Sequence, residues 1–381
     1  MIYTTLDING VEVKLSEHWP STGGVKEIHA IFCADVVRYP AFNERVAAIT
    51  EAYECLTGTP RLAGCRPVFA RYYLSDPANQ SDQLPDVLPE CAVSVIGQPP
   101  LNGSKINLLV YMQSGVETRQ CGHGVWAVSH GGYTHLWQGD TFLDIRDSEV
   151  ATMAYLTDYA RMLADRGLSM LDNCIRTWFF VRDVDANYAG VVSGRNFVFD
   201  RNGLNLNTHY IASTGIGGRP AERSETVAFN AYAVDGIRPE QVRFLKASTH
   251  LNPTMEYGVA FERGTTVRYG DRMHTWISGT ASINNRGEVM HVGDIEAQTL
   301  RMWENVEALL YEAGAAWDDV AYMTVYLRDI SDYAVVDRMY AKRFPDVPRV
   351  IVLAPVCRPE WLIEMECMAV TEVADNRYRS L

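Results

Sequence analysis

The sequence predicts an α+β protein made of three similar units, each with a mixed β-sheet covered by helices on one face. Two observations predict this fold. Each third of the 381 residues contains strands and helices in the same order, an order typical of helices packed on one face of a sheet. A short segment also recurs at the same place in that order, as RYYLSD (71–76), WFFVRD (178–183) and VYLRD (325–329). The expected units span residues 1–114, 115–236 and 237–381.

The last third shows the order of elements most clearly. HTWISGTASI (274–283) is rich in residues that favour strands, and NNRGE leads from it to VMHVG (289–293), which predicts a hairpin. A helix is expected between Asp294, a good N-cap, and Gly314. Apolar residues recur inside it at helical spacing, at Met302, Val306, Leu309 and Leu310.

The middle third repeats this order, and the first third follows it more loosely. In the last third, a strand, a shorter helix and two closing strands are expected at 321–329, 331–344 and 348–366. In the middle third, strands and helices are expected at 125–137, 148–167, 174–183, 185–199, 209–218 and 225–234. In the first third, a helix, a strand and two closing strands are expected at 40–58, 66–76, 91–100 and 105–113.

Composition excludes several classes of partner. The net charge of −13 and the absence of a Lys/Arg run argue against nucleic acid. No apolar run approaches the roughly 20 residues that span a bilayer, so we expect no membrane association. The eight cysteines have no paired spacing, and the chain does not open on a signal-like segment, which favours a reducing cytoplasm.

The closing segment PRVIVLAPVCRPEWLIEME (348–366) carries charges where apolar strands are expected. Arg349 offers a rigid fork for a carboxylate. A partly desolvated carboxyl such as that of Glu364 can have a raised pKa and serve as a general acid or base. Glu366 lies on the same face of a strand as Glu364, so the residues alone leave the choice between them open. The two charges also fit an ordinary ion pair between strands.

The other two units provide an internal comparison. Asn107 in the first unit and Ala228 in the second fall at the place of Glu364, and Glu90 or Cys91 falls near the place of Arg349. Only the last unit carries both charges. This difference favours one working site in the molecule.

Several segments resemble the RidA family, also called YjgF or L-PSP. The first of these segments is ISGTASI (277–283). The expected helix and the strand after it contain AQT (297–299), AGA (313–315), DDV (318–320) and MTVYLRD (323–329). The closing strands contain PRV (348–350) and CRPEWLIEME (357–366). The resemblance is close over 275–371, and the other two units are degenerate copies. It implies a pseudo-trimer within one chain, since members of this family are small trimers with ligand sites in the clefts between subunits.

A narrower resemblance links the chain to chorismatases, larger RidA-like enzymes that hydrolyse chorismate. It rests on RTW (176–178), GR (194–195), ASTGIGG (212–218), FERG (261–264) and CRPEWLIE (357–364). These motifs account for a chain three times as long as a RidA subunit.

The resemblance to RidA proteins implies roles for four residues. Arg349 would bind the substrate carboxylate, and Glu364 would handle water and protons. Ser278 and Gly279 would present a hydroxyl and a backbone N–H to the substrate.

The resemblance to chorismatases implies four more site residues. Arg263 would bind a second carboxylate, and Arg195 and Thr214 would complete the cleft. Cys357 is similar to the cysteine of chorismatases that make 3-hydroxybenzoate, although a small buried hydrophobe is an equal alternative.

The chain also departs from both patterns. Asp337 and Ile351 stand where many RidA deaminases carry an Asn and a reactive Cys, and chorismatases lack an Arg at position 349. The signatures are therefore mixed, and the substrate stays open.

The sequence thus favours a cytoplasmic lyase or hydrolase for a small enol ether that bears carboxylates, such as chorismate. The alternatives are a RidA-type enamine or imine deaminase and a non-catalytic metabolite-binding protein. No cofactor is implied. Cys121, His123, His130 and His135 lie close in sequence without an acidic partner, so we expect no metal. Because three units already fill the trimer, we expect a monomer.

Overall fold

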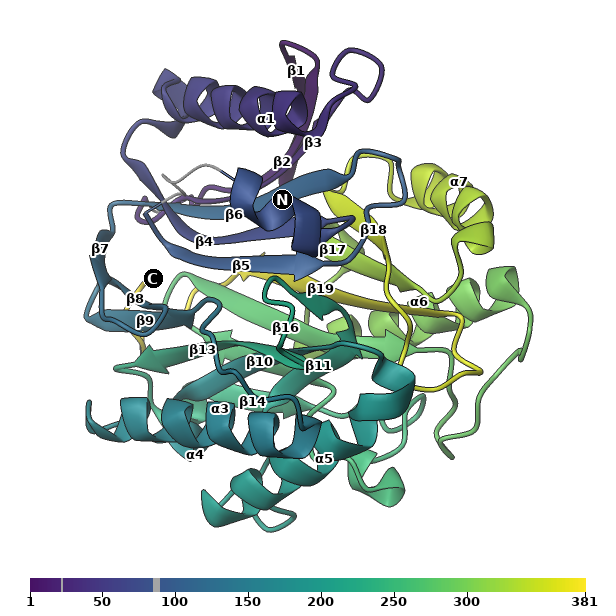
Figure 1. The fold of residues 1–381 in the computed structure, drawn as a ribbon. Helices are drawn as coiled ribbons and strands as arrows, with labels where there is room; N and C mark the ends of the chain where they lie inside the picture. Colours follow the sequence, from purple (N-terminus) through teal and green to yellow (C-terminus); the bar gives the residue numbers. More distant parts are fainter. Residues whose placement is uncertain (22, 85–89) are drawn as a thin grey trace.

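The computed structural model describes residues 1–21, 23–84 and 90–381, and the strands of these residues form three mixed sheets (Figure 1). The first sheet has the order β1 (Ile2–Ile8), β2 (Val11–His18), β3 (Glu27–Ala34), β6 (Ile106–Ser114), β4 (Cys65–Leu74), β5 (Ala92–Gly97) and β12 (Arg219–Pro220). The second has the order β11 (Ala212–Gly217), β10 (Cys174–Val181), β13 (Val227–Asp235), β9 (Tyr133–Gln138), β8 (Val125–His130) and β7 (Glu117–Gln120). The third has the order β14 (Val242–Leu245), β15 (Gly264–Arg268), β16 (Arg272–Ala281), β19 (Ile363–Glu372), β17 (Val320–Leu327) and β18 (Arg349–Leu353).

The three sheets share one arrangement of four strands. It runs β3-β6-β4-β5 in the first, β9-β13-β10-β11 in the second and β16-β19-β17-β18 in the third. The last pair is parallel in every sheet, and the pairs before it are antiparallel. The predicted α+β fold of three similar units is therefore confirmed.

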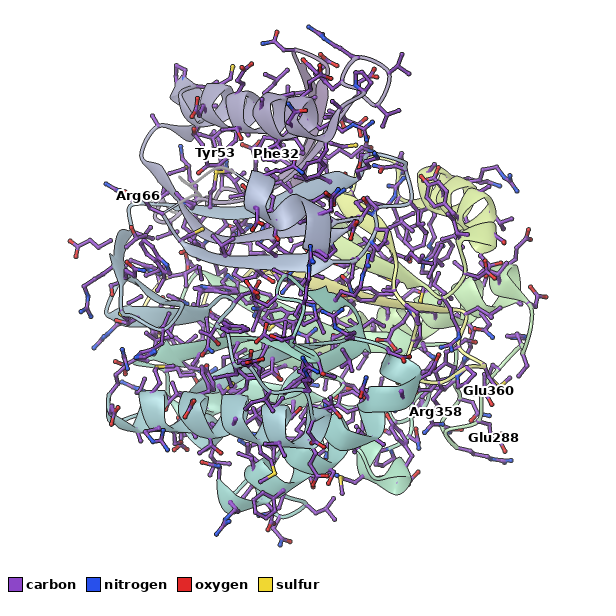
Figure 2. All side chains as sticks on the ribbon, viewed as in Figure 1. Phe32, Tyr53, Arg66, Glu288, Arg358 and Glu360 are labelled. Atoms are coloured by element: carbon purple, nitrogen blue, oxygen red, sulfur yellow. The ribbon has the colours of Figure 1, made fainter. Side chains whose placement is uncertain are left out.

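Helices cover the outer faces of the sheets, and the sheets meet in the middle of the molecule (Figure 1). Their bounds are α1 (Phe42–Thr57), α2 (Pro77–Gln80), α3 (Ser148–Ala164), α4 (Met170–Asn173), α5 (Val184–Arg201), α6 (Ile295–Ala313) and α7 (Tyr333–Arg343). Helix α6 begins and ends as its sequence predicts: the Asp294 side chain accepts a hydrogen bond from the Ala297 N–H, and Gly314 caps the end in the left-handed region. In the first unit, Phe32 and Tyr53 point toward each other between sheet and helix, with ring centroids 6.1 Å apart (Figure 2).

Aromatic rings from all three sheets fill the centre. Trp137 of β9 lies 5.8 Å from Trp276 of β16 and 5.2 Å from Phe69 of β4, measured between ring centroids. Trp178 of β10 lies 6.2 Å from Trp276. These contacts belong to the largest hydrophobic cluster, which joins the inner faces of the sheets.

Polar contacts also join the units. Arg272 forms a buried salt bridge to Glu27, with 2.6 Å between Nη1 and Oε1, and so ties β16 to β3. The short strand β12 pairs with β5, and so extends the first sheet with residues of the middle third. Apart from β12, the strands of each sheet fall in one third of the chain, and we propose unit limits at 1–114, 115–236 and 237–381 on this basis.

Three details differ from the expected elements. The predicted hairpin strand at 289–293 is reduced to an isolated bridge between Ile283 and Val289, because the chain turns into α6 at once. No second helix was expected in the first unit, and the structure has the single turn α2 there. Strands β1, β2, β3, β7, β12, β14 and β15 were not expected from the sequence. Within the described ranges, no helix is long and apolar enough to cross a bilayer.

Candidate active site

A cavity of about 320 Å³ lies between the second and third units. One wall is formed by α5 and β11, and the other by β16, the segment before β15 and the connection from β18 to β19. Its lining residues are Tyr188, Ala189, Val192, Arg195, Ser213, Thr214, Gly215, Tyr257, Val259, Phe261, Arg263, Gly279, Ala281, Ile283, Cys357, Arg358, Trp361 and Glu364. Six of the eight residues singled out from the sequence therefore meet here.

Close packing of two helices fixes the α5 wall. A Cβ on Gly190 would lie 2.2 Å from Ser148 Oγ of α3, and a Cβ on Gly194 would lie 2.6 Å from the Glu149 carbonyl oxygen. Only glycine lets α5 approach α3 this closely. The opposite face of α5 then presents Tyr188, Val192 and Arg195 to the cavity, at the i, i+4, i+7 spacing of one helical face.

Glu364 is a buried carboxyl that opens into this cavity. It is 4% exposed, and it lies on β19 opposite Ala281 of β16. A Cβ on Gly279 would lie 2.1 Å from Glu364 Oε1, so the glycine leaves room for the carboxyl group. Burial raises the pKa of Glu364 to about 8, the negative charge of Glu366 adds to the rise, and Arg263 and Arg176 oppose it. At neutral pH this group therefore holds a proton that it can donate.

Two buried guanidinium groups face the same cavity. Arg195 is 0% exposed and Arg263 is 5% exposed. Arg263 donates from Nη2 to the Asn252 carbonyl oxygen at 3.0 Å and to Asn252 Oδ1 at 3.1 Å, while its Nε has no partner. Arg195 has no partner for Nε or Nη2. Both groups lie over the Phe261 ring, at 5.9 Å and 5.3 Å from its centroid.

Neither guanidinium forms a salt bridge within the part of the chain that the structure describes. A buried charge without a counter-charge is costly. The pair therefore favours an anionic ligand, and two guanidinium groups suit a ligand with two carboxylates.

Three residues expected to contact the substrate use their polar atoms within the protein. Ser278 Oγ donates to the Glu262 carbonyl oxygen at 2.6 Å and accepts from the Ser213 N–H at 2.9 Å. The Gly279 N–H donates to Thr214 Oγ1 at 2.9 Å. These bonds join β11 to β16 and hold the second and third units together at the cavity.

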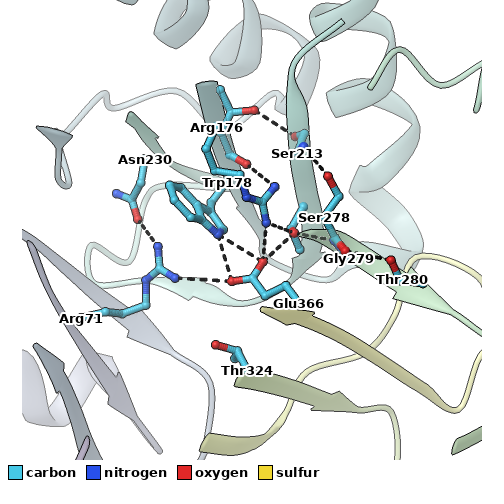
Figure 3. Close-up of polar contacts among 12 residues, drawn as sticks. Arg71, Arg176, Trp178, Ser213, Asn230, Ser278, Gly279, Thr280, Thr324 and Glu366 are labelled. Carbon is cyan, nitrogen blue, oxygen red and sulfur yellow. Dashed lines mark hydrogen bonds and ion pairs between the residues drawn. The ribbon is translucent and has the colours of Figure 1, made fainter. Parts of the chain in front are cut away.

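Glu366 lies in a network of polar contacts (Figure 3), away from the cavity that Glu364 lines. Its Oε2 lies 2.7 Å from Arg176 Nη2 and accepts from Thr214 Oγ1 at 2.6 Å, and its Oε1 accepts from Trp178 Nε1 at 3.0 Å. Arg71 Nη1 of the first unit lies 3.9 Å from Oε1. Glu366 is thus the anion of a buried network at the centre of the molecule, and only Glu364 lines the cavity.

Arg349 does not reach the cavity of Glu364. It lines a second cavity, between the first and third units, together with Asn107. The register explains the separation. Glu364, Asn107 and Ala228 occupy equivalent places, opposite Tyr326, Tyr73 and Phe180.

The equivalents of Arg349 follow from the same register. They are Ser213, paired with Thr177 of β10, and Val93, paired with Ala70 of β4. The expectation of Glu90 or Cys91 was therefore two to three residues too early.

In each of three clefts between units, the position equivalent to Glu364 in one unit lies with the position equivalent to Arg349 in another unit. Ser213 lies with Glu364, Arg349 with Asn107, and Val93 with Ala228 in a third cavity of about 390 Å³ between the first and second units. The two charges of the third unit therefore serve different clefts.

Cys357 is a neutral thiol beside the acid. Burial raises its pKa to about 12, and the Glu364 carboxyl adds to the rise. A thiol that stays protonated is a poor nucleophile. Cys357 therefore contributes shape and a weak donor to the cavity wall.

Sequence reasoning did not assign a role to four polar or aromatic residues of the wall, Tyr188, Tyr257, Arg358 and Trp361. Arg358 stacks over Tyr257 and Trp361, with its guanidinium carbon 4.8 Å and 4.9 Å from their ring centroids. Tyr188 shares the helical face of Arg195, and that spacing was available as a signal. The described residues contain no cluster of three or more His, Cys, Asp or Glu side chains placed to hold a metal ion.

A solved chorismatase structure has a similar fold. It aligns with a TM-score of 0.64 and 18% identity over 82% of this chain and 96% of that structure. At this identity the likeness shows the arrangement of three units and nothing about the reaction.

The sequence comparisons match part of the chain. A model of the endoribonuclease L-PSP family matches residues 264–371. The 3-aminoacrylate deaminase RutC of Acinetobacter baylyi is 33% identical over 96 residues, which are 25% of this chain and 76% of the relative. A RutC family protein of Pyrococcus abyssi is 42% identical over 88 residues, which are 23% of this chain and 68% of the relative. The chain therefore belongs to the RidA family, the family of RutC and of the endoribonuclease L-PSP proteins.

Proposed function

We propose that this protein is a small-molecule enzyme that cleaves an enol ether bearing two carboxylates, with chorismate as the best-matched substrate. One observation carries the proposal. Glu364, a carboxyl group that is protonated at neutral pH, opens into the same cavity as the guanidinium groups of Arg195 and Arg263, which form no salt bridge among the described residues. The family relationship and the fold support it, although neither identifies the reaction.

The charges of the cavity fit the two ends of such a substrate. Chorismate carries one carboxylate on its ring and one on its enolpyruvyl group. Arg195 and Arg263 would each bind one of them, and each pairing would supply the counter-charge that a buried guanidinium lacks. The apolar wall, which includes Val259, Ile283 and Trp361, suits the ring between them.

Glu364 would supply the proton that starts the cleavage. An enol ether is activated when its terminal methylene carbon is protonated, which leaves an oxocarbenium centre next to the ether oxygen. Water then adds to this centre, loses a proton to the Glu364 carboxylate, and the hemiketal collapses to pyruvate and a ring alcohol. Glu364 thus returns to its protonated form after one turnover.

Cys357 would affect the fate of the ring. If water completes the reaction, the products are pyruvate and a dihydroxy-cyclohexadiene carboxylate. If a rearrangement of the ring completes the reaction instead, the products are pyruvate and 3-hydroxybenzoate, and no water is taken up. The protonated thiol of Cys357 occupies wall space near Glu364. We expect Cys357→Ala to shift the product ratio toward the diene acid, since it opens that space to water.

The deaminase alternative requires a different pairing. A RidA-type imine hydrolysis would use Arg349 and Glu364 on one substrate, and these residues line separate cavities. One relative is named a 3-aminoacrylate deaminase, so the experiment below also tests an enamine substrate.

The deciding experiment measures pyruvate release from chorismate, with ring products identified by mass spectrometry. We expect Glu364→Gln to lower kcat/KM by about 100-fold to 10,000-fold, the usual contribution of a general acid. Glu360→Gln is the matched control, because Glu360 is exposed and does not line the cavity. In Figure 2, Glu360 lies near Arg358 at the edge of the molecule.

Arginine variants test the substrate class. Arg263→Lys keeps the charge and loses the planar fork, so we expect a rise in KM, while the exposed Arg286→Lys should behave as wild type. If wild type releases no pyruvate from chorismate, the proposal fails. Ammonia release from 2-aminoacrylate in that case would establish the deaminase instead.

A further inference from the structure

Five of the nine histidines lie together toward one end of the sheets, and the proposed reaction does not use them. They are His18 of β2, His29 of β3, His130 of β8, His135 of β9 and His274 of β16. All three units therefore contribute to this histidine cluster. His274 lies near the start of β16, whereas Gly279 and Ala281 near its end line the cavity of Glu364. The cluster is thus separate from the candidate active site.

Contacts across the unit boundaries connect the cluster. His274 Nε2 of the third unit lies 2.9 Å from Glu27 Oε1 of the first unit. His18 stands opposite Glu27 in the pairing of β2 with β3. The ring of Tyr269, in the third unit, lies 5.1 Å from His274 and 6.1 Å from His135 of the second unit, measured between centroids. The cluster therefore lies at a junction of the three units.

The rings are packed closely, and the protein leaves most of their polar atoms unpaired. His29 is 0% exposed, and neither of its ring nitrogens has a hydrogen-bond partner among the described residues. Its ring stacks on Tyr111, with centroids 4.3 Å apart. His130 stacks on His135 at 5.0 Å, and both nitrogens of His130 are also unpartnered in the described part of the chain. A protonated imidazole donates from both nitrogens, so these surroundings favour the neutral ring.

The anions of the junction already have positive partners. Glu27 is 0% exposed and forms a salt bridge to Arg272, and it also accepts from the Tyr111 hydroxyl. Asp271 Oδ2 lies 2.7 Å from Arg272 Nη2. A further positive charge on a histidine ring would therefore be buried without a free counter-charge, which is costly.

Burial holds the rings in their neutral form near neutral pH. It lowers the pKa of His29 to about 3 and that of His130 to about 4, and Glu27 opposes both shifts. The pKa values of His18 and His135 are lowered as well, and burial is again the largest cause. The titratable and charged groups around the cluster are Glu27, Asp271, Arg272 and Glu372 and the hydroxyls of Tyr111, Tyr133, Tyr232, Tyr269 and Tyr322.

We propose that the histidine cluster is an acid-sensitive contact, which holds the three units together near neutral pH and opens when its rings take up protons. In the opened form water reaches the rings, so each ring can bind a proton with the ordinary pKa of about 6.5. Below that pH, each ring that is neutral in the closed form favours opening by about tenfold per pH unit, until its own lowered pKa is reached. The inference does not depend on the enol-ether reaction.

Hydrogen exchange of the full-length protein tests the opening of this junction. It is followed by mass spectrometry between pH 7 and pH 5, with correction for the intrinsic exchange rate. We expect protection in β3, β9 and the first half of β16 to fall by about tenfold to 100-fold per pH unit below about pH 6, since at least two rings contribute. Helix α6, on the outer face of the third sheet, should keep its protection, because the junction opens while the unit stays folded.

Two substitutions assign the effect to the rings. His29→Phe keeps the stack on Tyr111 and cannot be protonated, so the fall in protection should become shallower by about tenfold per pH unit. His130→Phe, at a half-buried ring, should have the same effect. His123→Asn is the matched control, because His123 is exposed and outside the cluster, and Asn tolerates its left-handed backbone.

Three results would overturn the proposal. The first is protection at the junction that does not change with pH. The second is an equal loss of protection in α6, which would mean that the whole chain unfolds. The third is a wild-type slope in both Phe variants. If His29→Phe does not fold, His130→Phe still decides the question, since its ring is only half-buried.

Discussion

Replacing Glu364 by Gln has a consequence for stability that is independent of any substrate. Burial, together with the charge of Glu366, raises the pKa of Glu364 from 4.5 to about 8. The folded state therefore holds this proton more tightly than the unfolded state. Its stabilising contribution is complete below about pH 4.5, and it is lost as the pH rises toward about 8.

The magnitude follows from linkage. At about 1.4 kcal/mol for each pKa unit, ionisation of Glu364 costs the folded state about 5 kcal/mol at high pH, of which about 4 kcal/mol falls between about pH 5 and about pH 9. Gln has the same shape and does not titrate. We therefore expect the free energy of unfolding of Glu364→Gln, relative to wild type, to rise by about 4 kcal/mol over this range.

Urea unfolding followed by tryptophan fluorescence measures this difference at each pH. Taking the difference between variant and wild type cancels the titration of all other groups. Glu360→Gln should show a flat difference, because Glu360 is exposed. If the Glu364→Gln difference is equally flat, Glu364 is already ionised in the folded protein, and both the pKa argument and its role as an acid are refuted.

Three further outcomes are expected. Gly279→Ala places a Cβ 2.1 Å from Glu364 Oε1, so kcat/KM for pyruvate release should fall by about 100-fold, while the melting temperature shows that the protein still folds. The plot of kcat/KM against pH should fall tenfold per pH unit above about 8 as Glu364 ionises, and a profile that rises there would contradict its role as the acid. Glu366→Gln removes the anion 2.7 Å from Arg176 and 3.9 Å from Arg71, so urea unfolding should show a loss of about 3 kcal/mol or more, and a neutral result would contradict the buried network.

The sequence predicted the elements of the repeated unit well because their signals are local. Asp294 and Gly314 mark the ends of α6, and the aligned Tyr73, Phe180 and Tyr326 mark the same strand in the three sheets. The first two strands were missed because β1 and β2 form a hairpin at the edge of the first sheet, outside the unit that repeats most clearly.

The candidate site was predicted less completely because it forms between units. Resemblance pointed to Arg195, Arg263, Cys357 and Glu364, which the structure brings to one cavity. Sequence order does not say which neighbour each strand faces, so Arg349 was expected beside Glu364 although it lines another cleft.

The hydrogen bonds between the units at the site could not be predicted from the sequence either. Ser278 bonds to Ser213, 65 residues away in the chain. Only the packing of β11 against β16 reveals that its hydroxyl is already used. The expected monomeric state and cytoplasmic location stay predictions.

The three units are covalently joined, and three of the clefts described between them differ in charge. The cleft of Glu364 is lined by Arg195, Arg263 and Arg358, the cleft of Arg349 has charges of both signs, and the third is lined by Asp140, Glu222 and Glu225. A symmetric trimer of separate chains repeats every substitution at each junction, so its clefts must change together. In this chain each junction can change alone, so a substitution can alter the charge of one cleft and leave the other two as they are.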